Sequence, residues 1–265
     1  MEKLRLAQLE MLSILCEIDR ICQKYNLHYW LFAGTLLGAV RHMGFIPWDD
    51  DCDIAMMRED YEKFISVLQL ELPSHLFLQN KETDPHYPRK IVKIRSNRIK
   101  LIEKDEEFNE PYNQGVFVDI FIHDYYPSYS VPVLKYFQRY LDNKHRKFKF
   151  SSDSFERRLF NVCLVPQSLF FYISRAIFSI VWKCFRKKTS QYVGISFDYA
   201  DYKAVYHAED ILPVKTKIEF EKFSFSVPRN PDALLRQCYG DYRRWPNENE
   251  RHWHAKDIIV TDDRG

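Results

Sequence analysis

The chain of 265 residues has only seven glycines, and no two of its six cysteines form a C-x-x-C motif. With twelve prolines as well, it is not a collagen-like or low-complexity protein. The first twenty residues alternate charged and apolar positions and lack the long apolar run of a signal peptide. We therefore expect reduced thiols and a cytoplasmic protein, with a disulfide framework as the weaker alternative.

The chain also has no large excess of charge of one sign, because it contains 39 basic and 37 acidic residues and its net charge is only +2. A general nucleic-acid binder has a uniformly basic surface, so no nucleic-acid partner is expected. Apolar residues make up 46% of the chain, which is typical of a globular protein. Aromatic residues, at 16%, are unusually frequent.

Helical and strand patterns alternate through the first 125 residues and predict an α+β fold, a mixed sheet flanked by helices. Helices are expected at 2–25, 36–41, 58–69 and 231–239, and strands at 29–32, 52–56, 115–122 and 220–227. We divide the chain into a catalytic core (1–130), a basic helical insert (131–190) and a C-terminal segment that completes the core (191–265).

Four aspartates stand within five positions, next to an apolar strand: Asp49, Asp50, Asp51 and Asp53. Like charges this close repel one another, and a divalent cation such as Mg²⁺ or Mn²⁺ relieves the repulsion. Asp51 and Asp53 share one face if both lie on the strand. The alternative is a solvated acidic turn.

A third acid, Asp119, stands alone in the apolar strand GVFVDIFI, where an unpaired carboxylate is costly. It is the natural candidate to complete a metal site with Asp51 and Asp53. Upstream, Gly34 and Thr35 form a small turn between a strand and a helix. Such a turn presents backbone N–H groups to a phosphate.

The stretch WLFAGTLLGAVRHMGFIPWDDDCDIAM, residues 30–56, closely resembles the LicD family of phosphorylcholine transferases, which are related to the fukutins. The resemblance continues at 58–61, 118–121, 220–221, 227–228 and 239–242, and is weakest at 130–190. It implies a nucleotidyltransferase-like fold and a phosphotransferase that takes phosphocholine from CDP-choline, with Mg²⁺, and releases CMP. The implied acceptor is a sugar hydroxyl of a teichoic acid, lipopolysaccharide or capsule precursor.

The resemblance also implies roles for particular residues. The metal-binding and catalytic acids are Asp51, Asp53 and Asp119, and Asp119 is expected to orient the attacking hydroxyl. Phosphate contacts fall on Gly34 and Thr35. Further donor-binding candidates are the acids Asp49 and Asp50 and the basic residues Arg41, His42, Arg58, Lys93 and Arg95.

Some expectations stay open at this point. Lys93 and Arg95 fit an exposed strand face equally well, and His252 and His254 fit either a substrate-contacting lid or a surface tail. Choline needs an aromatic cage, for which Trp30, Trp48, Tyr112, Tyr125 and Tyr126 are available. Ribitol, glycerol or ethanolamine donors, and a non-catalytic glycan- or membrane-binding module, are the rival functions.

The insert carries thirteen basic and three acidic residues between 135 and 188, a net charge of +10, so the rest of the chain carries −8. Its apolar stretch, 159–184, is interrupted by Pro166 and Arg175 and is too short to span a bilayer. Apolar residues beside Lys and Arg are typical of a helix at the interface of an anionic membrane. We therefore expect peripheral attachment to the inner face of the cell membrane. The alternative is a core helix.

Overall fold

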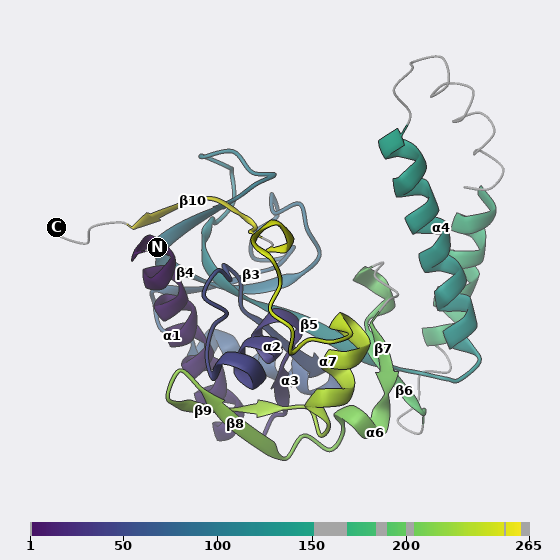
Figure 1. The fold of residues 1–265 in the computed structure, drawn as a ribbon, viewed down its shortest axis with the longest axis horizontal. Helices are drawn as coiled ribbons and strands as arrows, with labels where there is room; N and C mark the ends of the chain where they lie inside the picture. The colour runs from purple at the N-terminus through teal and green to yellow at the C-terminus, as the bar shows by residue number, and fades with distance from the viewer. Residues whose placement is uncertain (1, 151–168, 184–189, 200–203, 252, 261–265) are drawn as a thin grey trace. The chain divides into compact units, whose positions relative to one another are not determined.

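The computed structural model describes residues 2–150, 169–183, 190–199, 204–251 and 253–260 (Figure 1). Contacts divide the chain into two units, one of residues 1–123 with 209–265 and one of residues 124–208. The predicted C-terminal segment therefore contributes to both units, since 191–208 lies in the second.

A mixed sheet forms the centre of the first unit. In spatial order its strands are β1 (Tyr29–Leu31), β2 (Asp53–Met57), β5 (Gly115–Tyr126), β4 (Val92–Glu103) and β10 (Ala255–Val260), with β3 (Leu76–Gln79) also paired to β4. The β2–β5 pair is parallel, whereas β1–β2, β4–β5, β3–β4 and β10–β4 are antiparallel. The predicted α+β class is confirmed.

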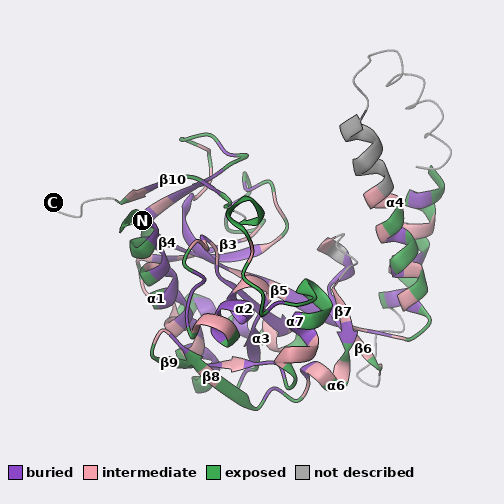
Figure 2. Ribbon diagram, viewed as in Figure 1, coloured by how far each residue is buried: buried purple, intermediate pink, exposed green. Residues whose placement is uncertain are grey.

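Helix α1 (Glu2–Lys24) lies along β4 and β10. It buries one apolar face, which includes Ala7, Met11, Leu15 and Ile18 at helical spacing, as the purple side of α1 in Figure 2 shows. Helices α3 (Arg58–Glu71) and α7 (Pro231–Tyr239) agree with the predicted ranges within two residues. Gly240 ends α7 with a φ of 64°, a conformation that glycine adopts without strain.

Helix α2 (Ala33–His42) begins three residues earlier than predicted. The chain leaves β1 through Phe32 in an extended conformation and Ala33 at a φ of 44°. A positive φ is uncommon for a residue with a Cβ. Gly34 and Thr35 thus lie in the first turn of the helix rather than in a separate turn before it.

The predicted strand 220–227 is confirmed only from Phe223, because Phe220 ends a separate strand and the residues between them form the turn of a hairpin. Strands β8 (Thr216–Phe220) and β9 (Phe223–Val227) pair antiparallel around Glu221 and Lys222. These two residues have φ values of 52° and 69°, typical of the tight two-residue turns that match strand twist. The alternating phenylalanines concealed the turn.

Glu221 in this hairpin holds the loop that leads to the acidic run. Its carboxylate accepts hydrogen bonds from Arg5 at 2.9 and 2.6 Å and from the Phe45 N–H at 3.2 Å. Its own N–H donates to the Met43 carbonyl at 2.8 Å. The hairpin, α1 and the loop after α2 are therefore joined at one carboxylate.

We expect Glu221→Gln to lower the free energy of unfolding by about 1–2 kcal/mol at neutral pH, because charge-assisted hydrogen bonds are lost. The Arg5 hydrogen bond lowers the pKa of Glu221 below its ordinary 4.5. The difference between wild type and variant should therefore persist above pH 4.5 and vanish as the pH falls through that lowered pKa. Urea titrations across this range measure it, with exposed Glu219→Gln as the control. A difference independent of pH would contradict the assignment.

The second unit contains α4 (Ser130–Phe150), a helix at 169–183, and the antiparallel strands β6 (Tyr192–Ile195) and β7 (Val205–His207). An aromatic core holds it together. It consists of Tyr126, Leu134, Phe137, Phe171, Phe178, Trp182 and Phe197. The helical pattern predicted for the insert is confirmed in its described parts, while 151–168 and the basic run 186–188 lie outside the described residues.

Candidate active site

A pocket of about 470 Å³ opens in the first unit beside the N-terminus of α2. Its lining combines carboxylates with aromatic and basic side chains. The residues that line it are Ala33, Gly34, Leu37, Arg41, Ile46, Trp48, Asp49, Asp51, Asp53, Tyr239, Asp241, Tyr242, Arg244, Pro246, Glu250, Arg251 and His254.

Three aspartates of the acidic run, Asp49, Asp51 and Asp53, reach this one pocket. Burial raises the pKa of Asp53 well above its ordinary value, and the neighbouring carboxylates Asp51 and Asp119 raise it further. Burial, followed by the charge of Asp51, likewise raises the pKa of Asp49. Charged carboxylates at these positions therefore need a positive partner.

The first turn of α2 fixes where Asp53 lies. The Asp53 N–H donates to the Thr35 hydroxyl at 2.7 Å, and the Phe32 N–H donates to the Asp53 carbonyl at 3.0 Å. Thr35 is buried and absent from the pocket lining, so its hydroxyl supports β2. Asp53 also lies opposite Asp119 in the parallel β2–β5 register, which confirms that the two acids are neighbours.

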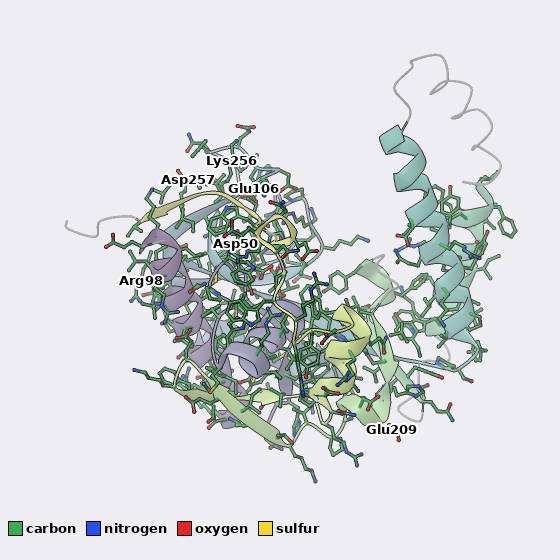
Figure 3. The ribbon with its side chains drawn as sticks, in the orientation of Figure 1. Asp50, Arg98, Glu106, Glu209, Lys256 and Asp257 are labelled. Carbon is green, nitrogen blue, oxygen red and sulfur yellow. The ribbon has the colours of Figure 1, made fainter. Side chains whose placement is uncertain are left out.

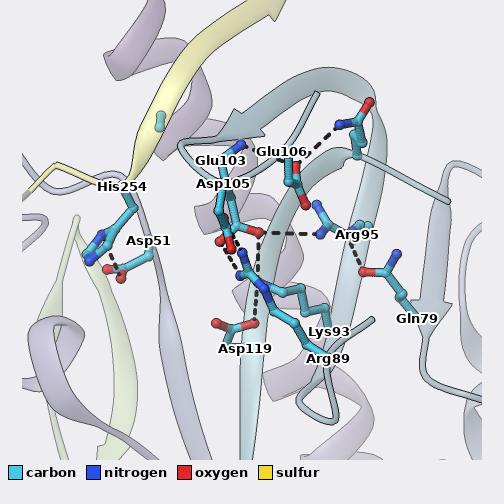
Figure 4. A network of polar contacts seen from close by, with 12 residues as sticks. Asp51, Gln79, Arg89, Lys93, Arg95, Glu103, Asp105, Glu106, Asp119 and His254 are labelled. Atoms are coloured by element: carbon cyan, nitrogen blue, oxygen red, sulfur yellow. Dashed lines mark hydrogen bonds and ion pairs between the residues drawn. The ribbon is translucent and has the colours of Figure 1, made fainter. Parts of the chain in front are cut away.

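Asp119 belongs to a buried network of charges behind the pocket (Figure 4). The Lys93 ammonium lies 3.0 Å from its Oδ1, 3.7 Å from Glu103 and 3.1 Å from the centre of the Phe117 ring. Arg95, also fully buried, donates to Gln79 and to the Gly115 carbonyl. Lys93 and Arg95 were expected to bind phosphate or to face solvent. The structure buries both in the sheet, where they face carboxylates and an aromatic ring.

Asp50 fastens the C-terminal strand to the acidic run. Its buried carboxylate accepts hydrogen bonds from the backbone N–H groups of His254 and Ala255 at 2.8 and 2.5 Å. The His254 Nδ1 lies 3.1 Å from Asp50 and 3.4 Å from Asp51. Figure 3 shows Asp50 inside the unit, whereas Lys256 and Asp257 lie on the outer strand. His254 thus lines the pocket, which favours the lid interpretation over a surface tail.

Asp50→Asn should lower the free energy of unfolding by about 1–3 kcal/mol, because the two backbone N–H groups lose a charged acceptor and the second oxygen, which faces the His254 Nδ1, becomes an NH₂ group. The Ala255 amide should also exchange its hydrogen faster than in the wild type, because its acceptor is weaker. Denaturant titration and hydrogen exchange measure the two effects. Glu62→Gln, an exposed change on α3, is the control. Unchanged exchange at Ala255 would contradict the role of Asp50.

The predicted donor-binding residues divide into two groups. Gly34, Arg41 and Asp49 line the pocket, whereas Asp50, His42, Arg58 and Lys93 do not. Arg41 is itself held in place, since its guanidinium donates to the carbonyls of Tyr242 at 2.8 Å and Arg244 at 3.2 Å. Arg41 therefore joins α2 to the segment after α7, at the edge of the pocket.

Sequence reasoning missed much of the part of the lining that comes from residues 239–251. The Arg251 guanidinium lies 4.2 Å from the centre of the Trp48 ring. The Trp245 ring lies 6.0 Å from Trp48 and 5.0 Å from His42. Of the residues suggested for a choline cage, Trp48 lines the pocket, while Trp30 is buried in the core against His123. The signal was the dense run of aromatic and basic residues at 239–245.

The pocket acids suit a hard divalent cation in their donor chemistry, since all supply carboxylate oxygens. The Asp49 Oδ2 is buried and has no hydrogen-bond partner among the described residues. As the side chains stand, however, no three His, Cys, Asp or Glu in the described part of the chain converge into a formed metal centre. A cation bound here would have to take its remaining ligands from donor phosphate or water.

Known proteins are similar to this chain over most of its length. Residues 26–155 match the family described as LicD/FKTN/FKRP, nucleotidyltransferase domain. The lipopolysaccharide cholinephosphotransferase LicD of Haemophilus influenzae is 30% identical over 265 residues, which cover 95% of each chain. The human ribitol 5-phosphate transferase FKRP is 45% identical over 40 residues, 15% of this chain and 8% of that protein. An uncharacterised protein of Rickettsia prowazekii is 30% identical over 122 residues, 46% of this chain and 41% of that one. The chain belongs to the LicD family.

Proposed function

We propose that the protein is a phosphotransferase that moves phosphocholine from CDP-choline to a sugar hydroxyl of a cell-surface glycan. The observation that carries this is one pocket that joins Asp49, Asp51 and Asp53 to the N-terminus of α2 and to aromatic and basic side chains. The near full-length similarity to a lipopolysaccharide cholinephosphotransferase supports the choice of donor and acceptor class. We also propose that the core of the protein has a nucleotidyltransferase-like fold.

The pocket offers a complementary group for each part of the donor. N–H groups in the first turn of α2 suit the pyrophosphate, because helix N-termini attract anions. Arg244 and Arg251 add positive charge to the lining. Trp48, Tyr239 and Tyr242 provide the aromatic surface that a quaternary ammonium requires.

In the reaction, the acceptor oxygen attacks the phosphorus that carries choline, the bond to the CMP oxygen breaks and CMP leaves. Asp51, with 23% of its side chain exposed, would orient the hydroxyl and accept its proton. The corresponding role of Asp119 stays a prediction, because Lys93 already lies 3.0 Å from its carboxylate. A bound Mg²⁺ or Mn²⁺, to which Asp51 and Asp53 would offer carboxylates in the pocket with Asp119 as the predicted third ligand, would neutralise charge on the phosphates.

A different alcohol on the same nucleotide is the second candidate. The relative named as a ribitol 5-phosphate transferase supports it, through the segment that it shares with this chain. Teichoic acid and capsule precursors remain possible acceptors beside lipopolysaccharide. We place the reaction at the inner face of the cell membrane, where lipid-linked acceptors are built. In the described residues, no helix has the length and apolarity needed to cross a bilayer.

CMP release from CDP-choline, CDP-ethanolamine, CDP-glycerol and CDP-ribitol, with and without Mg²⁺, tests the proposal. We expect cation-dependent release that is fastest with CDP-choline. Preference for another alcohol would move the assignment to the second candidate. If no CDP-alcohol is turned over, the enzyme proposal fails and the non-catalytic module remains.

A further inference from the structure

The helix at 169–183 in the second unit has an apolar face that no described residue covers. Seven large apolar side chains on it are between 38% and 66% exposed: Leu169, Phe170, Tyr172, Ile173, Ile177, Ile180 and Val181. Most of them recur three or four residues apart, so they form one stripe along the helix. Scattered single apolar residues are normal on a surface, but a continuous stripe marks an interaction site.

The other side of the same helix is firmly packed. Phe171, Phe178 and Trp182 are between 1% and 8% exposed and belong to the aromatic core of the unit. The Phe171 ring stacks on Tyr140 of α4 at 4.2 Å, and Trp182 stacks on Tyr126 at 5.6 Å. Buried residues therefore lie on one side of the helix and exposed residues on the other, as the colours of Figure 2 indicate. Because its packed side is fixed, the helix cannot turn its stripe inward.

The described parts of α4 and of helix 169–183 carry almost only positive charge. Within the stripe helix, the Arg175 guanidinium lies over the Phe197 ring at 5.1 Å, and Lys183 is exposed at the C-terminal end. On α4, Lys135 and Arg139 are exposed. Asp142 is the one acid in the described ranges 130–142 and 169–183. An apolar face beside exposed Lys and Arg is complementary to anionic lipid, and less so to a neutral or basic protein surface.

The packed face of the helix decides between lying on a membrane and crossing it. The fifteen described residues extend about 22 Å at 1.5 Å per residue, against the roughly 30 Å hydrocarbon core of a bilayer. The packed face also forbids full insertion, since it belongs to the core of the unit. A helix of this kind rests in the headgroup region with its stripe toward the acyl chains.

We propose that the stripe of helix 169–183, with Lys183 at its C-terminal end, docks the protein on an anionic phospholipid surface. It supplies the membrane contact that the proposed function assumes, and to that extent rests on it. The docking surface belongs entirely to the second unit, whereas the pocket belongs to the first. Membrane binding and catalysis are therefore separable by mutation.

The test is sedimentation of the full chain with vesicles of phosphatidylcholine and phosphatidylglycerol in equal parts, and with pure phosphatidylcholine vesicles. We expect binding to the mixed vesicles and little to the pure ones. The triple variant Ile173→Gln, Ile177→Gln, Ile180→Gln should bind at least about tenfold more weakly. Lys183→Gln should weaken binding at low salt and have less effect at high salt.

Leu70→Gln is the matched control, because Leu70 lies on α3 and is 85% exposed. It should bind vesicles like the wild type. Circular dichroism and CMP release should be unchanged in the triple variant, so a failure of docking is distinguishable from a failure of catalysis. Equal binding by the triple variant and the wild type would overturn the proposal. The proposal would also be overturned if ultracentrifugation showed that the wild type is a dimer that does not bind vesicles and that the triple variant is a monomer.

Discussion

Replacing Asp53 with asparagine is expected to stop CMP release while it raises the melting temperature of the cation-free protein. The loss of activity should be at least about 10³-fold, because the variant removes a charge that the transition state needs through its cation. The gain in stability has a separate cause. Asp53 is buried among Asp49, Asp51 and Asp119, and its charge is unfavourable there when no cation is bound.

The direction of the pH dependence follows from the same burial. The pKa of Asp53 is raised above its ordinary 3.8 in the folded protein, so the folded state binds more protons than the unfolded state above that pH. Without a divalent cation, wild-type stability should therefore fall as the pH rises through the raised pKa. Asp53→Asn should remove part of this fall. Each kcal/mol gained corresponds to roughly 2–4 °C in melting temperature for a chain of this size.

Thermal melts between pH 5 and 8, with and without Mg²⁺, measure the effect beside the CMP assay. The cation should raise the wild-type melting temperature most at the higher pH and should have little effect on the variant. Asp257→Asn is the control, since Asp257 lies outside the pocket lining, with 41% of its side chain exposed, a 3.8 Å pair with Lys3 and a local hydrogen bond from the Ile258 N–H (Figure 3). A variant that keeps its activity, or whose stability falls, would refute the role given to Asp53.

The sequence predicted well where one local rule was enough. The period of α1, the Pro231 start and Gly240 end of α7, and the apolar run of β5 all define their elements without outside help. The position of Asp119 beside Asp53 was also predictable, because an isolated acid in an apolar strand needs a partner.

Prediction from the sequence failed where contacts between residues distant in the chain determine the environment of a side chain. Lys93 and Arg95 alternate with apolar residues like an exposed strand face, but Glu103, Asp119 and Phe117 enclose them, and strand pairing brings these together. Residues 239–251 lie nearly 200 positions from Trp48, so no spacing rule predicts that they share its pocket. His252, which was predicted together with His254, lies outside the described residues. His254 lines the pocket, and its backbone N–H donates to Asp50.

Lys93→Met is the change with the largest expected effect on folding. The ammonium of Lys93 is 1% exposed and faces both Asp119 and Glu103, so its removal leaves a buried carboxylate without its cation. Breaking such a pair costs about 3–5 kcal/mol. The free energy of unfolding from denaturant titration should fall by that amount at neutral pH. Exposed Lys63→Met, on α3, should change it little.

A double variant separates loss of the charge pair from loss of packing. Burial raises the pKa of Asp119 and Lys93 lowers it, so without Lys93 that pKa must rise further. The deficit of Lys93→Met should therefore shrink as the pH falls and Asp119 takes up a proton. Adding Asp119→Asn should recover most of the lost stability at neutral pH, because two neutral groups of similar size replace a buried ion pair. If the double variant were no more stable than Lys93→Met, the cost would lie in the contact with Phe117, and Lys93 would not act through the charge of Asp119.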